Sequence, residues 1–202
     1  MRHARTLVFS FLLAAAGTAM AADWASGSTD WAKLPEAKQT RQGLYLTPQQ
    51  ALEMKKKDPA VVLVDIRTRA EAMYVGMPSD ADALVPYMEH QEIMADWDDK
   101  RQMYKLEPNS DFAAEMGRRL AARGLGKGAT VILICRSGDR SAKAADLLQT
   151  AGYAKVYSVA EGFEGDMAKE GPKAGQRAVN GWKNAGLPWS YKLDKAKMYF
   201  AQ

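Results

Sequence analysis

The chain contains few of the residue types that bind metals or form disulfides: one cysteine and two histidines among 202 residues. Since Cys135 is the only cysteine, a disulfide within the chain is excluded. His3 and His90 belong to no cluster of metal-ligand residues, and the sequence has no internal repeat or low-complexity tract. We therefore expect no metal ion and no other cofactor.

A long apolar run at the N-terminus is also missing. The apolar core of the first segment, residues 7–16, is too short to span a bilayer comfortably. It follows Arg2 and Arg5 and precedes Ala19-Met20-Ala21, a small-x-small cleavage site. We predict a secretory signal over 1–21 and a periplasmic protein with no membrane contact after cleavage. An uncleaved N-terminal anchor is the alternative.

The remainder of the chain lacks an excess of charge of either sign. Of 28 basic residues, two belong to the predicted signal, which leaves a net charge of +2 against 24 acidic residues. Such a balance gives no electrostatic footprint for nucleic acid. Removing 21 of the 202 residues leaves 181, a length that suits one α/β domain with extensions. No obvious apolar surface stripe is present, so we expect a monomer.

Apolar segments alternate with helical patterns along the rest of the chain. Residues 61–64 and 131–134 are continuous apolar runs, as in parallel strands buried on both faces. Thr47-Pro48-Gln49-Gln50 is a capping box that begins a helix. We predict strands over 44–46, 61–64, 83–85, 131–134 and 156–159, and helices over 48–57, 68–74, 110–123 (capped by Ser110) and 141–151. The alternation indicates an α/β fold with a central parallel sheet of about five strands and helices on both faces. Residues 87–109 have no pattern that assigns them.

Cys135 ends the second apolar run and opens the segment Cys135-Arg136-Ser137-Gly138-Asp139-Arg140-Ser141. The following helix would point its free N–H groups toward the sulfur, and Gly138 can take a positive φ that curls further N–H groups around it. Cysteine has an ordinary pKa of about 8.5, which a helix N-terminus and arginines lower. The segment is therefore typical of a nucleophilic thiolate at the water-facing rim of the sheet. A small buried hydrophobic residue is the alternative.

Residues from about 44 to 169 resemble a single rhodanese domain. The loop 135–141 matches Cys-Arg-Ser-Gly-x-Arg-Ser, a specific signature of catalytic members, and Asp65-Ile66-Arg67 followed by Glu71 matches the family's Asp-Val-Arg near an early strand end. Residues 76–81 depart from the usual Gly-His-Ile-Pro-Gly-Ala, and residues 161–165 from the common Gly-Gly-x-x-x-Trp. The resemblance predicts a rhodanese domain over 44–170, between an N-terminal arm (22–43) and a C-terminal extension (171–202).

This resemblance implies a sulfurtransferase. Cys135 would take the outer sulfur of thiosulfate or a similar small anionic donor as a persulfide, and pass it to a thiol or cyanide. Arg136 and Arg140 would bind the donor, although either could instead point outward or pair with Asp139 or Asp65. The remaining substrate-binding residues would be Ser137, Gly138, Asp139 and Ser141, with the loop N–H groups holding the persulfide and the Asp139 carboxylate facing solvent. Asp65 and Arg67 would support the loop by ion pairing or capping.

Two other functions remain open at this stage. A phosphatase or arsenate reductase also has an arginine-bearing loop after a cysteine, but such phosphatases place five residues between cysteine and arginine, whereas four separate Cys135 from Arg140. The other possibility is a rhodanese-like sulfur-relay or binding module that docks on a dedicated periplasmic partner protein. The aromatic tail segment 181–191, which contains Trp182 and Trp189, would then be either a docking surface or a covering for the sheet.

Overall fold

The computed structural model describes residues 30–201, so the predicted signal and the first part of the predicted arm lie outside the described residues. The helices are α1 (Pro48–Lys57), α2 (Arg69–Val75), α3 (Phe112–Ala121) and α4 (Asp139–Thr150), with short 3-10 turns η1 (Trp31–Lys33), η2 (Glu36–Lys38) and η3 (Lys195–Lys197). Within this range no helix combines the length and the apolar character that crossing a bilayer requires.

Five parallel strands form the central sheet, in the order β1-β10-β9-β2-β4. Their bounds are β1 (Tyr45–Leu46), β2 (Val62–Asp65), β4 (Ala83–Leu84), β9 (Thr130–Ile134) and β10 (Lys155–Val159). In register, Val131 of β9 lies opposite Val62 of β2 and Val156 of β10. The two continuous apolar runs are thus central neighbours buried on both faces, which confirms the predicted parallel α/β sheet.

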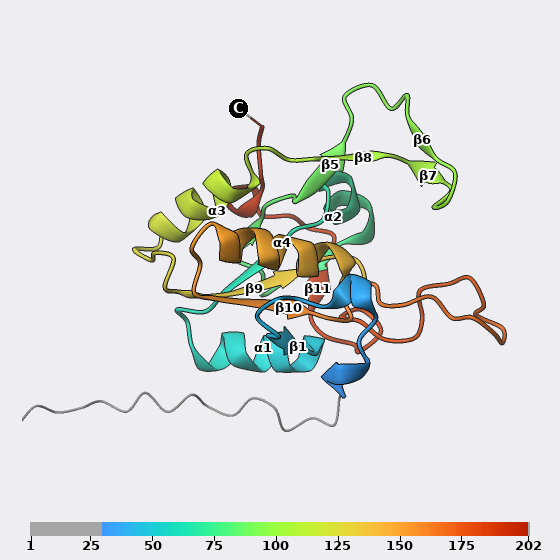
Figure 1. Ribbon diagram of the computed structural model, residues 1–202, viewed down its shortest axis with the longest axis horizontal. Coiled ribbons are helices and arrows are strands. Elements are labelled where there is room, and N and C mark those ends of the chain that lie inside the picture. The colour runs from blue at the N-terminus through green and yellow to red at the C-terminus, as the bar shows by residue number, and fades with distance from the viewer. Residues whose placement is uncertain (1–29, 202) are drawn as a thin grey trace, which may run out of the picture.

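Helices cover both faces of this sheet (Figure 1). Phe112, Met116 and Leu120 of α3 pack with α4 residues against alternate strand residues such as Val64 and Leu133. On the opposite face, α1 packs with Ala72 of α2 against the other alternation of strand residues. The two apolar clusters together make one core around the sheet, because successive strand side chains point to opposite faces.

Local capping explains where the first two helices begin. Thr47 and Thr68 are N-caps, and each forms a reciprocal capping box with Gln50 or Glu71 three residues later. The prediction that Ser110 caps α3 is wrong: Asp111 occupies the cap position, and its amide bonds to the Asn109 side chain. Helix α4 begins at residue 139 rather than 141, since the helix follows directly on the left-handed Gly138.

The unassigned stretch 87–109 forms an arm of short antiparallel strands that extends from the body of the fold (Figure 1). Strands β5 (Met88–His90) and β8 (Leu106–Pro108) pair at its base, and β6 (Trp97–Asp98) and β7 (Met103–Tyr104) pair near its tip. The rings of Trp97 and Tyr104 meet edge to face with their centroids 5.3 Å apart, and both are about half exposed.

The C-terminal tail packs onto the domain. Strand β11 (Trp189–Ser190) pairs antiparallel with β3 (Met77–Pro78), and Trp182 is completely buried in the same cluster as α1. A Cβ added to Gly76, whose φ is +90°, would lie 2.5 Å from the Trp189 ring, so only glycine allows this approach. Of the two alternatives for the aromatic tail segment, packing against the domain is therefore the correct one for Trp182.

Candidate active site

Two neighbouring strand ends bring the predicted site residues together. Strand β9 ends at Ile134 beside Asp65, the last residue of β2, and the Ile66 amide donates to the Ile134 carbonyl across 2.9 Å. Cys135 follows β9 directly, so the cysteine loop and the Asp65-Ile66-Arg67 segment meet at the carboxyl edge of the sheet. This edge is where ligands bind in open α/β sheets.

The Cys135 sulfur is held inside its own loop. The Gly138 amide donates to Sγ across 3.1 Å, and the Ser141 hydroxyl lies 3.5 Å from Sγ. Gly138 has a φ of +103°, as predicted, and it is the residue on which the N-terminus of α4 begins. The sulfur therefore faces a backbone N–H and the positive end of a twelve-residue helix, both of which favour an anion.

The expectation that this sulfur lies at a water-facing rim is wrong. Cys135 is 1% exposed and belongs to the first apolar cluster. The turn that follows β10 encloses the loop: the Phe163 amide donates to the Cys135 carbonyl across 2.8 Å, and a Cβ added to Gly138 would lie 2.2 Å from the Ala160 carbonyl oxygen. Sequence patterns gave no indication that residues 160–165 close over the loop.

Arg140 is fixed by a carboxylate from another helix. Its Nη1 and Nη2 donate to the two carboxylate oxygens of Glu71 across 2.7 and 2.6 Å, and Glu71 also caps α2. Burial raises the pKa of Glu71, but the bonds and charge of Arg140 outweigh it and lower that pKa to about 2. Burial likewise opposes the charge of Arg140, but Glu71, and then the nearby Cys135 and Asp65, raise the pKa of Arg140.

Arg136 differs from Arg140, because its guanidinium makes no hydrogen bond or ion pair with any residue in 30–201. Burial, followed by the positive charge of Arg177, lowers the pKa of Arg136. The Ser137 and Asp139 side chains are partly exposed beside it. The cysteine loop thus carries one arginine that is held in an ion pair, Arg140, and one that is not, Arg136.

Asp65 and Arg67 form a fully buried ion pair. Nε and Nη2 of Arg67 contact both carboxylate oxygens of Asp65 at 2.6 to 3.1 Å, and Nη2 also donates to the Gly76 carbonyl. The guanidinium stacks over the Phe163 ring at 3.9 Å from its centroid. These contacts connect β2, the start of β3 and the turn that encloses the loop.

Ser141 is buried in a small hydroxyl network. Its hydroxyl donates to the Gly138 carbonyl across 2.9 Å and lies 2.8 Å from the Ser158 hydroxyl of β10. Besides approaching the sulfur, it therefore ties the first turn of α4 to the sheet.

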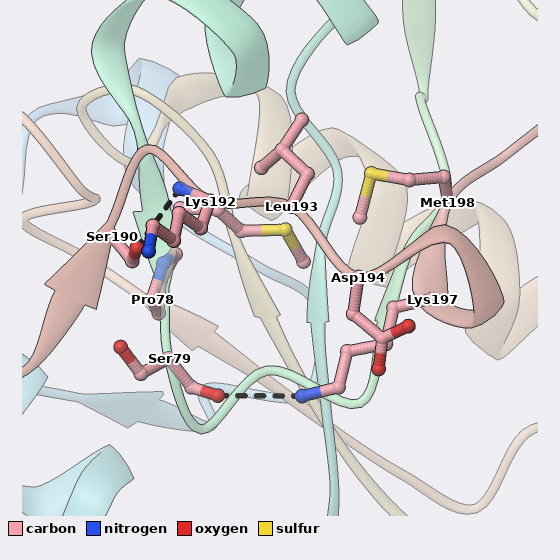
Figure 2. Close-up of a pocket in the computed structure, with 9 residues that line it drawn as sticks. Pro78, Ser79, Ser190, Lys192, Leu193, Asp194, Lys197 and Met198 are labelled. Carbon is pink, nitrogen blue, oxygen red and sulfur yellow. Dashed lines mark hydrogen bonds between the residues drawn. The ribbon is translucent and has the colours of Figure 1, made fainter.

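A cavity of about 220 Å³ lies elsewhere, between β3, β11 and the tail, and Figure 2 shows its lining. Lys197 spans one side of it and donates to the Ser79 carbonyl. The cavity contains none of the predicted site residues, so the cysteine loop remains the candidate active site. Across residues 30–201, acidic, histidine and cysteine side chains form no group that could hold a metal ion.

Comparisons with known proteins identify the family of the domain. The sequence profile of the rhodanese-like domain matches residues 47–169. The chain belongs to the rhodanese-like domain family. The crystal structure of Rv0390 from M. tuberculosis is 32% identical with a TM-score of 0.56, over 73% of this chain and 97% of that one. An uncharacterised protein of Rickettsia rickettsii is 29% identical over 143 residues, which cover 70% of this chain and 92% of the relative.

Three residues near the cysteine loop were not identified as site residues from the sequence. Glu71 appeared there only as part of the resemblance, and its Thr-x-x-Glu capping box indicates a helix start but not a bond to Arg140. Lys38 and Arg177 lie outside the matched range 47–169. A Cβ on Gly138 would lie 3.1 Å from Cδ of Lys38, and Arg177 acts on Arg136. No local pattern marks either residue.

Proposed function

We propose that this rhodanese-like protein is a sulfurtransferase that moves a sulfane sulfur from thiosulfate or a similar anionic donor to a thiol or cyanide. The observation that carries the proposal is the Gly138 amide 3.1 Å from the Cys135 sulfur at the N-terminus of α4. An inert core cysteine has no need of a donated N–H, whereas a thiolate or persulfide anion is stabilised by one.

Two displacements make up the proposed reaction. The Cys135 thiolate attacks the outer sulfur of thiosulfate; a Cys135 S–S bond forms, the S–S bond of thiosulfate breaks, and sulfite leaves with the electron pair. Cyanide or a thiolate then attacks the outer sulfur of the persulfide, and the Cys135 thiolate leaves. Arg136 is the uncommitted cation available to attract the donor and the departing sulfite, and the Gly138 amide holds the anionic sulfur between the two steps.

Access to the sulfur is part of the proposal. Because Cys135 is 1% exposed, the donor reaches it only when the loop or the turn over it opens. The partly exposed residues 136, 137 and 139 border the buried sulfur on the solvent side. Such openings are common gating steps in enzymes and occur on microsecond to millisecond timescales.

The proposed setting is the periplasm, reached through the cleavable signal over residues 1–21. There the chain would act as a monomer on a small anionic donor, with no nucleic acid and no membrane contact. An exported protein with one unpaired cysteine is consistent with a use for that thiol.

The burial of Cys135 also favours a second candidate, a rhodanese-like relay or binding module that docks on a dedicated periplasmic partner. In this case the sulfur would become accessible only in the complex. The arm at 87–109 exposes apolar side chains, Ile93, Met94, Trp97 and Tyr104 among them, as a docking element does.

Turnover of thiosulfate with cyanide by the mature protein separates these functions. A sulfurtransferase produces thiocyanate at a rate that is saturable in thiosulfate, and Cys135→Ser abolishes it. The matched control is Ser110→Ala, which removes an exposed hydroxyl outside the cysteine loop and should retain the rate. Absence of thiocyanate from wild-type protein would leave the relay module as the supported function.

A further inference from the structure

Arg177, which follows the family-matched range 47–169, is linked to the cysteine loop through Gly165. The Arg136 carbonyl accepts hydrogen bonds from the amides of Glu164 and Gly165 at 3.0 and 3.2 Å. Nη1 of Arg177 donates to the Gly165 carbonyl across 2.6 Å, and residue 177 forms a β-bridge with Met167. Gly165 therefore bonds to both arginines: its amide donates to the Arg136 carbonyl, and its carbonyl accepts from Arg177. Arg177 lies at the base of the loop 166–180, which projects from the fold (Figure 1).

The other cations near this position are neutralised. Arg140 pairs with Glu71, and the Lys38 ammonium lies 2.8 Å from both carboxylate oxygens of Asp166. Neither Arg136 nor Arg177 has an ion pair among residues 30–201. Arg136 of the cysteine loop and Arg177 of the tail therefore each present a guanidinium group without an ion pair.

Two like charges held close together in a partly buried site are unfavourable on their own. Burial and then Arg177 lower the pKa of Arg136, and Arg140 adds to this shift, while Glu71 and Glu164 oppose it. An anion bound between the two guanidinium groups relieves the repulsion, and a guanidinium binds oxyanions with charge-assisted hydrogen bonds. The benefit is larger for an anion of charge −2 than for one of charge −1, because the attraction scales with the product of the charges.

We propose that Arg177 is a specificity residue of the donor site, acting with Arg136 to select sulfur donors that carry two negative charges over donors that carry one. This inference rests on the proposed sulfurtransferase function and defines the class of its substrate. It assigns a role to the tail, which supplies a donor-binding group that the domain at 47–169 lacks.

The test compares two donors on Arg177→Gln. Thiosulfate is a dianion, and methanethiosulfonate is a monoanion with the same transferable sulfur. We expect the KM for thiosulfate to rise about tenfold, as for the loss of one charge-assisted contact, and the KM for methanethiosulfonate to rise about twofold or less. Arg177→Lys should recover part of the loss for thiosulfate. The control is Arg101→Gln, which removes an exposed charge from the distant β6–β7 arm and should change neither KM.

A purely structural role of Arg177 through Gly165 would change both donors equally, and that result, or no change, would overturn the inference. A wild-type protein that turns over neither donor would instead count against the proposed function. Binding is then measured without turnover, as the rise in melting temperature that thiosulfate produces in Cys135→Ser. The inference predicts that adding Arg177→Gln removes most of this rise, and an unchanged rise would contradict it.

Discussion

The guanidinium of Arg140 and the carboxylate of Glu71 form a two-pronged ion pair between helices α4 and α2, across 69 residues of chain. The pair fixes the far end of the cysteine loop to the helix that follows β2. It also determines how the stability of the fold depends on pH, because the carboxylate has a pKa of about 2 in place of 4.5.

A lowered pKa in the folded state stabilises the protein above the unfolded pKa of 4.5, and this contribution is lost as the pH falls from there toward 2. We expect Glu71→Gln to lower the free energy of unfolding by about 3 kcal/mol at pH 7 and to weaken its pH dependence between pH 5 and 3. Urea unfolding at several pH values measures both. Glu53→Gln, which affects an exposed pair with Lys57, is the control and should change little. A pH dependence identical to that of the wild type would refute this role of Glu71.

Gly138 occupies a position that admits no side chain. Its φ is +103°, and a Cβ would lie 2.2 Å from the Ala160 carbonyl oxygen, a backbone atom with little freedom to move. We expect Gly138→Ala to destabilise the fold by about 2 kcal/mol or more and to displace the amide from the sulfur, so that persulfide formation is lost. Chemical unfolding and activity measure the two effects.

Gly128→Ala is the matched control for Gly138→Ala, since a Cβ there meets nothing within 4 Å and its φ is not positive. This variant should be neutral or slightly stabilising. Equal behaviour of the two variants would mean that the loop tolerates a side chain at 138.

Trp182 makes the tail part of the core. It is fully buried, its amide donates to the Gly162 carbonyl, and its indole N–H donates to the Pro188 carbonyl across 2.9 Å. We expect Trp182→Ala to cost about 3–5 kcal/mol of unfolding free energy, and truncation after Lys173 to prevent folding. Phe200→Ala, at a residue that is 60% exposed, is the control and should cost little. A truncated chain that unfolds cooperatively at the wild-type midpoint would contradict this account.

The sheet could be predicted because two of its neighbouring strands, β2 and β9, are continuous apolar runs. Residues 61–64 and 131–134 have the continuous apolar pattern that is typical of parallel strands buried on both faces, and two capping boxes give the first two helix starts. The arm at 87–109 could not be predicted, because its strands are two or three residues long and owe their existence to partners across the arm. No periodicity develops over so few residues.

The position of Gly138 in the loop could be predicted from its residues, but the surroundings of the loop could not. Residues 135–141 indicate a thiolate cradle, and the Gly138 amide is where that pattern requires it. The enclosure by residues 160–165, the link to Glu71 and the approach of Arg177 are contacts between segments distant in sequence. Such contacts depend on how the elements dock, which no local pattern encodes.

The most direct test of the central claim is the intact mass of the mature protein after brief incubation with thiosulfate and removal of excess reagent. We predict a gain of about one sulfur atom, its absence in Cys135→Ser, and its reversal by cyanide. An unchanged mass in the wild type, or the same gain in Cys135→Ser, would contradict the account.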